Sequence, residues 1–309
     1  MQAALIAGEQ VLVMLMLMAV GFVMYRMKLL SDETCAQLNK LLIITVTFAV
    51  LVSSYNRAFD PVLLRNIGIG ILFATIGHIV GTVLAFIFVH GKGERARGER
   101  FACFVSNCGF MGIPLISAFV GPEGVIYASC GVLMLNVYQW TVGRFILEGR
   151  FSTDGIAKRI FLNPGTMGCI VGLTLFCLPV TLPRPIATTL DYVASLNTPL
   201  AMIVIGTSVA RTRIAEHLRN RRTYLICFIR LILVPLCCLP IFILLGADET
   251  VSVSEFLVVA CPCAATSSLI PANFGLKEAS ERNAGLVAIS TVLSVLTIPL
   301  MVLVRSLAM

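Results

Sequence analysis

The sequence contains few charged residues, since Asp, Glu, Lys and Arg make up only 13% of its 309 residues. A soluble globular domain carries roughly a quarter. Hydrophobic residues make up 58% of the chain, and its mean hydropathy is +0.95. This shortage of charge excludes a soluble enzyme, a secreted disulfide scaffold and a disordered chain. One membrane span takes about 20 apolar residues, so ten spans would use ~200 residues and leave only short loops. We therefore predict a single all-α polytopic membrane domain over residues 1–309.

The sequence also lacks the spacing of a metal site. Cys261 and Cys263 are separated by one residue, whereas paired zinc ligands usually have two to four residues between them. Most of the eleven cysteines fall in or beside apolar stretches, where we expect them to act as small packing residues. A catalytic pair of His78 with Cys103, Cys108 or Ser106 has no supporting motif or spacing. We therefore predict no metal, no cofactor and no enzyme activity.

Apolar runs bounded by charge predict ten membrane spans. They cover residues 8–25, 38–55, 66–89, 101–120, 124–143, 163–182, 187–210, 223–246, 253–275 and 284–304. The loops after the odd-numbered spans hold 18 of the 23 Lys and Arg residues. By the positive-inside rule these loops face the cytoplasm, so both termini are expected outside it.

The net charge of +7 therefore reflects topology in a plasma (inner) membrane and requires no nucleic-acid partner. No basic segment precedes the first apolar run, so we expect this run to stay inserted and not to be cleaved.

The basic loop 144–159 divides the chain into two sets of five spans, residues 1–150 and 151–309. An odd number of spans in each half means that the halves insert with opposite topology. Transporters built from inverted repeats have this arrangement, and their sites lie where corresponding helices are broken near the membrane midplane. We therefore predict two inverted five-helix repeats.

Two spans contain the residues of a broken helix. The fourth span contains the segment 106–114 and the ninth contains 261–271, and both combine Gly or Pro with hydroxyl or amide side chains. Such residues leave backbone groups without helical partners. Around a polar cavity, the N-termini of half-helices present N–H groups and positive dipole ends to an anion. The alternative is a kinked helix with close glycine packing. The candidate substrate-binding residues are Asn107, Gly112, Pro114, Asn197, Arg230, Cys263, Thr266, Ser267 and Ser268.

A shift of about 152 residues superimposes the two halves in sequence and places His78 on Arg230. An ionisable residue at depth in a membrane is costly and indicates function by default. Arg230 could bind an anion or anchor helix C-terminal carbonyls, and His78 could titrate or bond a neighbouring helix as a neutral imidazole. His78, Asn136 and Gln139 are the candidates for coupling or gating.

Carboxylates are missing from the middle of every predicted span, and Glu255 in particular falls near the start of the ninth. Proton- and sodium-coupled carriers commonly use buried carboxylates. A buried Arg230 without a carboxylate partner favours an anionic substrate over a cation site. Coupling through backbone carbonyls or through protonation of His78 stays open.

The run Asn107-Cys108-Gly109-Phe110-Met111-Gly112-Ile113-Pro114-Leu115 resembles the Asn-x-x-Phe-x-Gly-Ile-Pro-Leu signature of the auxin efflux carrier family. This family includes the plant PIN-FORMED carriers and many bacterial permeases, often named as malonate or malate permeases. Asn163-Pro164, Pro199-Leu200-Ala201 with Gly206, and Pro262 with Phe274-Gly275 are also similar. The resemblance covers nearly the whole chain. Two departures are Thr266-Ser267-Ser268, where members often carry Pro or Asn, and Phe48, where many have Pro.

The resemblance implies a fold related to bile-acid transporters and sodium/proton antiporters. Spans 1, 2, 6 and 7 would form a scaffold, spans 3–5 and 8–10 a moving transport domain, and helices four and nine would cross at their breaks. Asn107 would contact a substrate carboxylate and Pro114 would shape the first break. Opposite them, Thr266, Ser267 and Ser268 would offer hydroxyls and freed amides.

The predicted function is secondary transport or facilitated passage of small organic anions, such as malonate, malate or auxin-like carboxylates, by an elevator-type movement. The alternatives are a sodium-coupled symporter of the bile-acid type and a membrane ligand sensor without flux. The expected partners are a small carboxylate, membrane lipids and, from the family alone, a second copy of the chain that joins through the scaffold.

Overall fold

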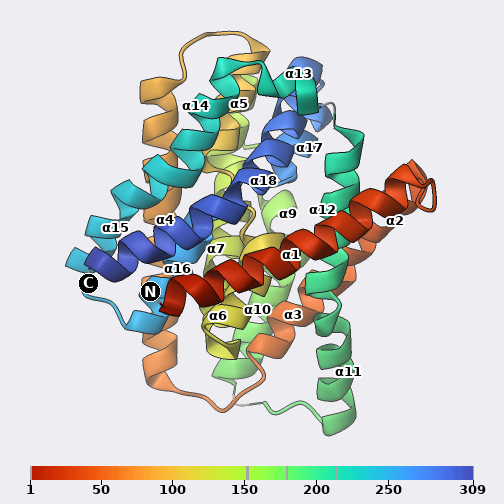
Figure 1. Ribbon diagram of the computed structural model, residues 1–309. Helices are drawn as coiled ribbons and strands as arrows, with labels where there is room; N and C mark the ends of the chain where they lie inside the picture. The colour runs from red at the N-terminus through yellow and green to blue at the C-terminus, as the bar shows by residue number, and fades with distance from the viewer. Residues whose placement is uncertain (1, 151–152, 179, 213, 309) are drawn as a thin grey trace.

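The computed structural model describes residues 2–150, 153–178, 180–212 and 214–308, and its secondary structure is helical throughout apart from one isolated β-bridge. Figure 1 shows a bundle of tilted helices in which α1 crosses one face and the two termini lie near each other. The first half of the chain contains α1 (Gln2–Arg26), α2 (Asp32–Leu41), η1 (Leu42–Val46), α3 (Thr47–Ser54), α4 (Pro61–Phe88), α5 (Glu94–Phe104), η2 (Cys108–Gly112), α6 (Ile113–Phe119), α7 (Pro122–Tyr138), η3 (Gln139–Gly143) and α8 (Arg144–Glu148). The rest contains α9 (Ile156–Phe161), α10 (Pro164–Cys177), α11 (Arg184–Ser195), α12 (Asn197–Arg211), α13 (Ile214–Leu218), α14 (Arg221–Phe228), η4 (Ile229–Leu233), α15 (Val234–Leu244), α16 (Glu249–Ala260), α17 (Thr266–Asn273) and α18 (Lys277–Ala308).

Among the described residues, seven helical segments are long and apolar enough to cross a membrane, and two shorter apolar helices, Cys108–Phe119 and Pro164–Cys177, accompany them. The predicted span 253–275 is divided between α16 and α17. The chain is therefore an all-helical polytopic membrane protein.

Helix starts follow from local sequence. Asp60, Asn163 and Asp248 cap α4, α10 and α16, because each side chain accepts a hydrogen bond from a backbone N–H of the first turn. Proline occupies the first position of α4 and α10, where its missing N–H costs nothing. Three of the four η segments are π-helical turns inside longer helices, and η2 is the first turn of the helix Cys108–Phe119; such turns often mark functional positions.

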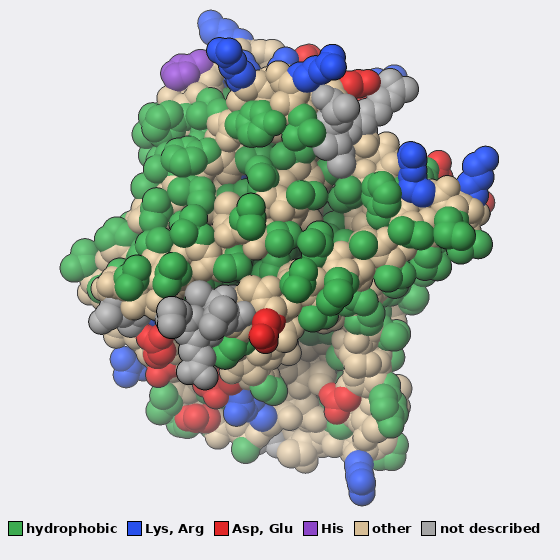
Figure 2. Space-filling model, viewed as in Figure 1, with side chains coloured by type: hydrophobic (Ala, Val, Ile, Leu, Met, Phe, Trp, Pro, Cys, Tyr) green, Lys and Arg blue, Asp and Glu red, His purple; other side chains and the backbone are tan. Residues whose placement is uncertain are grey.

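Hydrophobic side chains cover the middle of the face shown in Figure 2, and basic side chains gather at its upper end. That end carries the loop regions around α5 and α13 (Figure 1). This arrangement matches a bundle whose belt contacts lipid tails while its ends contact water and headgroups.

The crossing of α1 with α12 depends on two glycines. A Cβ built on Gly206 would overlap the carbonyl oxygen of Met18, and one built on Gly21 would overlap the carbonyl oxygen of Ile203. Small residues let membrane helices approach until their backbones touch, and α1 and α12 use this contact.

Gly206→Leu should destabilise the protein by about 1–3 kcal/mol or more, because an inserted side chain must separate two backbones in contact. Thermal unfolding in detergent measures this change. Gly68→Leu is the matched control, since a Cβ at this exposed α4 glycine meets nothing within 4 Å. Equal melting temperatures for the two variants would contradict the close approach of α1 and α12.

Candidate functional site

The candidate site is built on two non-helical segments that lie side by side. Residues 105–107 separate α5 from η2, and residues 261–265 separate α16 from α17. The Asn107 amide donates to the Pro262 carbonyl at 2.8 Å, and the Ala264 amide donates to the Val105 carbonyl at 3.0 Å. A β-bridge between Ser106 and Cys263 joins them further. Each of the two segments that the sequence marks as broken thus contains a non-helical stretch, and each stretch provides hydrogen-bond partners for backbone groups of the other.

Side chains form further hydrogen bonds with backbone groups in and around segments 105–107 and 261–265, which together we call the crossing. Ser106 Oγ donates to the Val258 carbonyl at 2.6 Å, and Arg230 Nε donates to the Cys261 carbonyl at 3.0 Å. The Cys263 amide donates to Ser290 Oγ at 3.1 Å, and Asn283 Nδ2 donates to the Ser267 carbonyl at 2.7 Å. Irregular backbone is tolerated at membrane depth only with such internal partners. The crossing is therefore a built feature of the fold and not a loose kink.

A cavity of about 970 Å³ reaches this crossing, and we name it the Asn107 cavity. At its inner end lie Asn107, Phe110, Ala265 and Ser268. Residues of α2 and α12 form one wall, and residues of α17 and α18 form the other. It extends to the loops after α12 and α17, where its lining includes Arg95, Arg211, Glu216, His217, Asn220, Glu278, Glu281 and Arg282. Burial, then the positive charge of Arg282, lowers the pKa of His217, which favours a neutral imidazole there at neutral pH.

Two helix N-termini meet at the inner end of the Asn107 cavity. The helix Cys108–Phe119 begins directly after Asn107, and α17 begins at Thr266. In the first turn of α17 the N–H groups of Ser267 and Ser268 already donate to the Ala264 and Ala265 carbonyls. The attraction for an anion therefore comes mainly from the helix dipoles, which place their positive ends at the same point. The Asn107 side chain is only 4% exposed and does not cap its own helix, and among the described residues no hydrogen bond occupies its side-chain amide, which can therefore bind a ligand. This arrangement suits a small anion with hydrogen-bond acceptors.

A second cavity of about 660 Å³, the Asn197 cavity, approaches from the other end of the bundle. Its lining includes Pro114, Ser117 and Glu123 on one side and Ser53 and Asn197 on the other. The loop 55–60, which contributes Asn56 and Arg57, lies at the opposite end of Figure 1 from α13. The broken helices therefore lie between two cavities that open toward opposite ends.

The predicted substrate-binding residues divide into three groups. Asn107 and Ser268 line the Asn107 cavity, while Pro114 and Asn197 line the Asn197 cavity. The rest lie at the crossing without lining either cavity; they are Gly112, Arg230, Cys263, Thr266 and Ser267. Arg230 lies behind the crossing, where it binds a carbonyl at the C-terminal end of α16, as the anchoring alternative describes.

The predicted coupling or gating residues line neither cavity. His78 is buried, its Nδ1 lies 2.6 Å from the Ala74 carbonyl of its own helix, and its ring packs on Tyr138. Gln139 Nε2 donates to Asn136 Oδ1, and Asn136 Nδ2 donates to Asn163 Oδ1. The two amide residues thus connect the end of α7 to the cap of α10.

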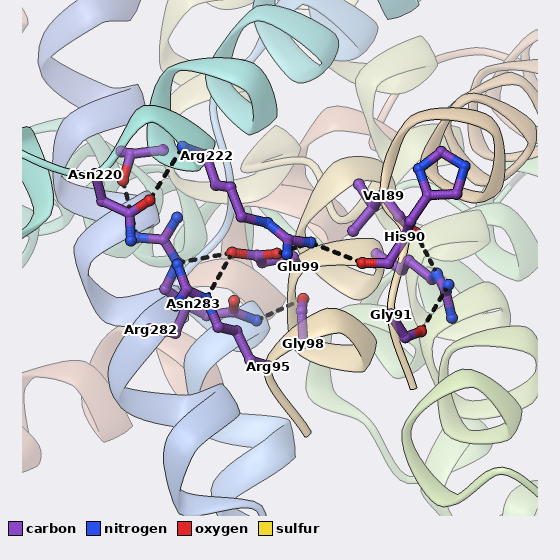
Figure 3. Close-up of polar contacts among 12 residues, drawn as sticks. Val89, His90, Gly91, Arg95, Gly98, Glu99, Asn220, Arg222, Arg282 and Asn283 are labelled. Atoms are coloured by element: carbon purple, nitrogen blue, oxygen red, sulfur yellow. Dashed lines mark hydrogen bonds and ion pairs between the residues drawn. The ribbon is translucent and has the colours of Figure 1, made fainter. Parts of the chain in front are cut away.

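An ion-pair cluster beside the Asn107 cavity was not predicted. Glu99, with no exposed surface, lies 2.9 Å from Arg282 Nε, 2.9 Å from Arg222 Nη2 and 3.3 Å from Arg95 Nε. Figure 3 shows these three arginines around the Glu99 carboxylate. Arg282 Nη1 also donates to Thr223 Oγ1 at 2.8 Å. The four charged groups, which we name the Glu99 cluster, join α5 to α14 and α18. The spacing of Arg95 and Glu99, four residues apart on a helix, was the available signal in the sequence.

Comparison with known proteins identifies the chain. A family model described as membrane transport protein matches residues 6–156 and 150–302. The chain belongs to the auxin efflux carrier family. The family resemblance of the 107–115 run is thereby confirmed. The chain is 24% identical over 303 residues to an "Uncharacterized transporter" of Methanothermobacter thermautotrophicus, covering 94% of this chain and 96% of that protein. It is 26% identical over 246 residues to a "Putative malonate transporter" of Rhizobium meliloti, covering 74% of this chain and 76% of that protein.

The family and both relatives are transporters. This auxin efflux carrier family member is therefore a multi-pass membrane transport protein, and transport rather than catalysis is the activity expected of it.

Proposed function

We propose that this family member is a secondary transporter or facilitator of small organic anions, with carboxylates such as malonate, malate or auxin-like acids as substrates. The supporting observation is the inner end of the Asn107 cavity, where two helix N-termini and the side chains of Asn107 and Ser268 converge. A carboxylate placed there accepts hydrogen bonds from backbone and side-chain donors and benefits from both helix dipoles. Arg230, behind the crossing, adds a positive charge that favours an anion.

The proposed architecture is two inverted five-helix repeats that transport by an elevator-type movement. The scaffold would consist of α1, α2–α3, α10 and α11–α12, and the remaining spans would form the transport domain. Both cavities have walls from these two groups, since α2, α3, α11 and α12 face α6, α7, α17 and α18 across them. Movement of the transport domain along the scaffold would carry Asn107 and Ser268 from one cavity toward the other. Both termini would lie outside the cytoplasm, and the scaffold would be the surface for a homodimer in the plasma membrane.

The membrane potential favours export or exchange for an uncoupled anion. At 100 mV, inside negative, one negative charge gains about 2.3 kcal/mol on leaving the cell. This corresponds to an outward accumulation of ~50-fold at 1.4 kcal/mol per decade. Uptake against this potential requires a coupling ion, and the relative named as a malonate transporter gives no direction.

Charge movement in proteoliposomes on a solid-supported membrane tests the proposal. Malonate, malate, succinate, lactate and indole-3-acetate are presented in turn, with and without sodium and at two pH values. We expect a saturable current, or labelled counterflow, with at least one carboxylate in the absence of sodium. A strict sodium requirement would favour the bile-acid-type symporter. Ligand binding without counterflow for any acid would contradict transport and indicate a sensor.

A further inference from the structure

Glu255 is a fully buried carboxylate in the middle of α16. It has 0% exposure, and neither of its oxygens has a hydrogen-bond partner among the described residues. The expectation that no carboxylate lies inside a span is therefore wrong at this residue. The reason is that α16 begins at Glu249, with Asp248 as its cap, and not at residue 253. Glu255 consequently lies deeper in the bundle than its sequence position indicates.

An ionised carboxylate in this position would have neither a cation nor hydrogen-bond donors among the described residues to stabilise its charge. Removing it from water costs many kcal/mol unless a cation or several donors pair with it, and a lone buried acid instead takes a proton. The structure thus represents a state in which Glu255 is the neutral acid. A protein that retains such a costly group inside the membrane gains a site that can bind and release one proton.

The surroundings of Glu255 supply no counterion in this state. Its Oε1 lies against Gly70 of α4, because a Cβ on that glycine would be 3.5 Å from Oε1 and 3.2 Å from Cys130 Sγ. The titratable or charged side chains on the elements packed against α16 are Arg65 and His78 on α4, Glu123, Tyr127, Cys130 and Tyr138 on α7, Cys237 and Cys238 on α15, Cys108 on η2, Arg230 on η4, and Lys277, Glu278, Glu281, Arg282 and Arg305 on α18. Arg305 binds Glu249, and Arg230 binds the Cys261 carbonyl. No described side chain in this set forms a hydrogen bond or ion pair with Glu255.

A polar path leads from the Asn197 cavity toward Glu255. Glu123 lines that cavity and accepts a hydrogen bond from the Tyr127 hydroxyl at 3.2 Å. Asn66 Nδ2 donates to the same hydroxyl at 3.5 Å. Asn66 lies four residues before Gly70 on α4, so about 6 Å along the helix separates it from the glycine that touches Glu255. Tyr127 lies three residues before Cys130 on α7 in the same way.

We propose that Glu255 is the proton-binding site that couples carboxylate movement to proton movement in the same direction, with Glu123, Tyr127 and Asn66 as its connection to the Asn197 cavity. This inference rests on the proposed carboxylate transport. Glu255 belongs to the helix that leads into the crossing segment 261–265, and Ser106 of the other segment binds the Val258 carbonyl one turn away. Loss of the proton places an unpaired charge beside this crossing, which disfavours the conformation described. The proton and the carboxylate are then released in the same conformational change of the protein.

The test uses the purified full-length chain in proteoliposomes that contain a pH-sensitive dye, with the membrane voltage clamped by potassium and valinomycin. Malonate is the first probe, followed by the other acids of the panel. With the wild type, an inward malonate gradient should acidify the lumen beyond the change in protein-free vesicles. Glu255→Gln should abolish this protein-dependent acidification while labelled malonate still exchanges across the membrane, because exchange requires no release of the proton. Glu249→Gln on the same helix is the matched control and should acidify the lumen as the wild type does, since Glu249 is an exposed acid paired with Arg305.

Glu255→Asp keeps a titratable carboxyl group on a side chain one methylene shorter. This variant keeps the proposal testable even if Glu255→Gln fails to fold. It should retain acidification with a shifted pH midpoint, and a midpoint equal to that of the wild type would overturn the proposal. Wild-type counterflow without acidification, or acidification that persists in Glu255→Gln, would also overturn it. Failure of the proposed function looks different, because the wild type would then show no counterflow with any acid of the panel.

Discussion

Glu99→Gln should lower the free energy of unfolding by about 3–5 kcal/mol, because it leaves buried positive charge without its counterion. Glu99 is the only acidic member of the Glu99 cluster, and Arg282 is 6% exposed. The Asn283 bonds to the Gly98 and Ser267 carbonyls lie beside it, so the loss should also loosen the start of α17.

Thermal unfolding in detergent, followed by the reaction of buried cysteines with a thiol dye, measures this effect. Nine of the eleven cysteines are buried, so we expect them to react with the dye mainly on unfolding. The control is Glu94→Gln on the same helix, since Glu94 forms no ion pair among the described residues. If both variants melt at the same temperature, the cluster contributes nothing to stability.

Asn107→Ala should weaken carboxylate binding by about tenfold to a hundredfold, which corresponds to the 1.5–3 kcal/mol of a hydrogen bond to a charged group. The amide lies at the inner end of the Asn107 cavity and is free of any capping bond. The backbone hydrogen bond from Asn107 to Pro262 does not depend on the side chain, so the crossing should survive.

The concentration for half-maximal current on a solid-supported membrane gives the change in affinity. Asn273→Ala is the control, because Asn273 is an exposed residue at the end of α17 and lines neither cavity. Unchanged affinity in Asn107→Ala would remove this residue from the site, whereas a loss shared by the control would indicate a general effect on the protein.

Much of the fold could be predicted because its signals are local. A long apolar run bounded by charge marks a membrane helix wherever it occurs, and glycine and proline indicate that a helix is interrupted nearby. Pro262 lies in one break, whereas Gly112 and Pro114 lie in the helix that begins directly after the other. The contact between the two breaks was predicted from the resemblance alone. No local property of residues 106 and 263 indicates that they form a β-bridge.

Helix ends and side-chain burial were less predictable. Hydropathy placed the starts of the fourth and ninth spans at residues 101 and 253, but α5 begins at Glu94 and α16 at Glu249. Charged side chains lower the hydropathy of a helix end even when the bundle buries them. Glu99 therefore fell outside the predicted fourth span and Glu255 near the start of the predicted ninth, although one lies within an ion-pair cluster and the other is buried without a partner among the described residues.

The sequence by itself determined that this chain crosses a membrane many times, which helices break and to which family it belongs, because hydropathy, proline and glycine act through the nearest residues. Only the tertiary structure decided which polar side chains meet. Asn107 and Ser268 share one cavity, Pro114 and Asn197 share another, and Arg230 binds a backbone carbonyl behind them. The physical reason is that a buried polar group is defined by its partners, and in this bundle those partners come from helices distant in the sequence.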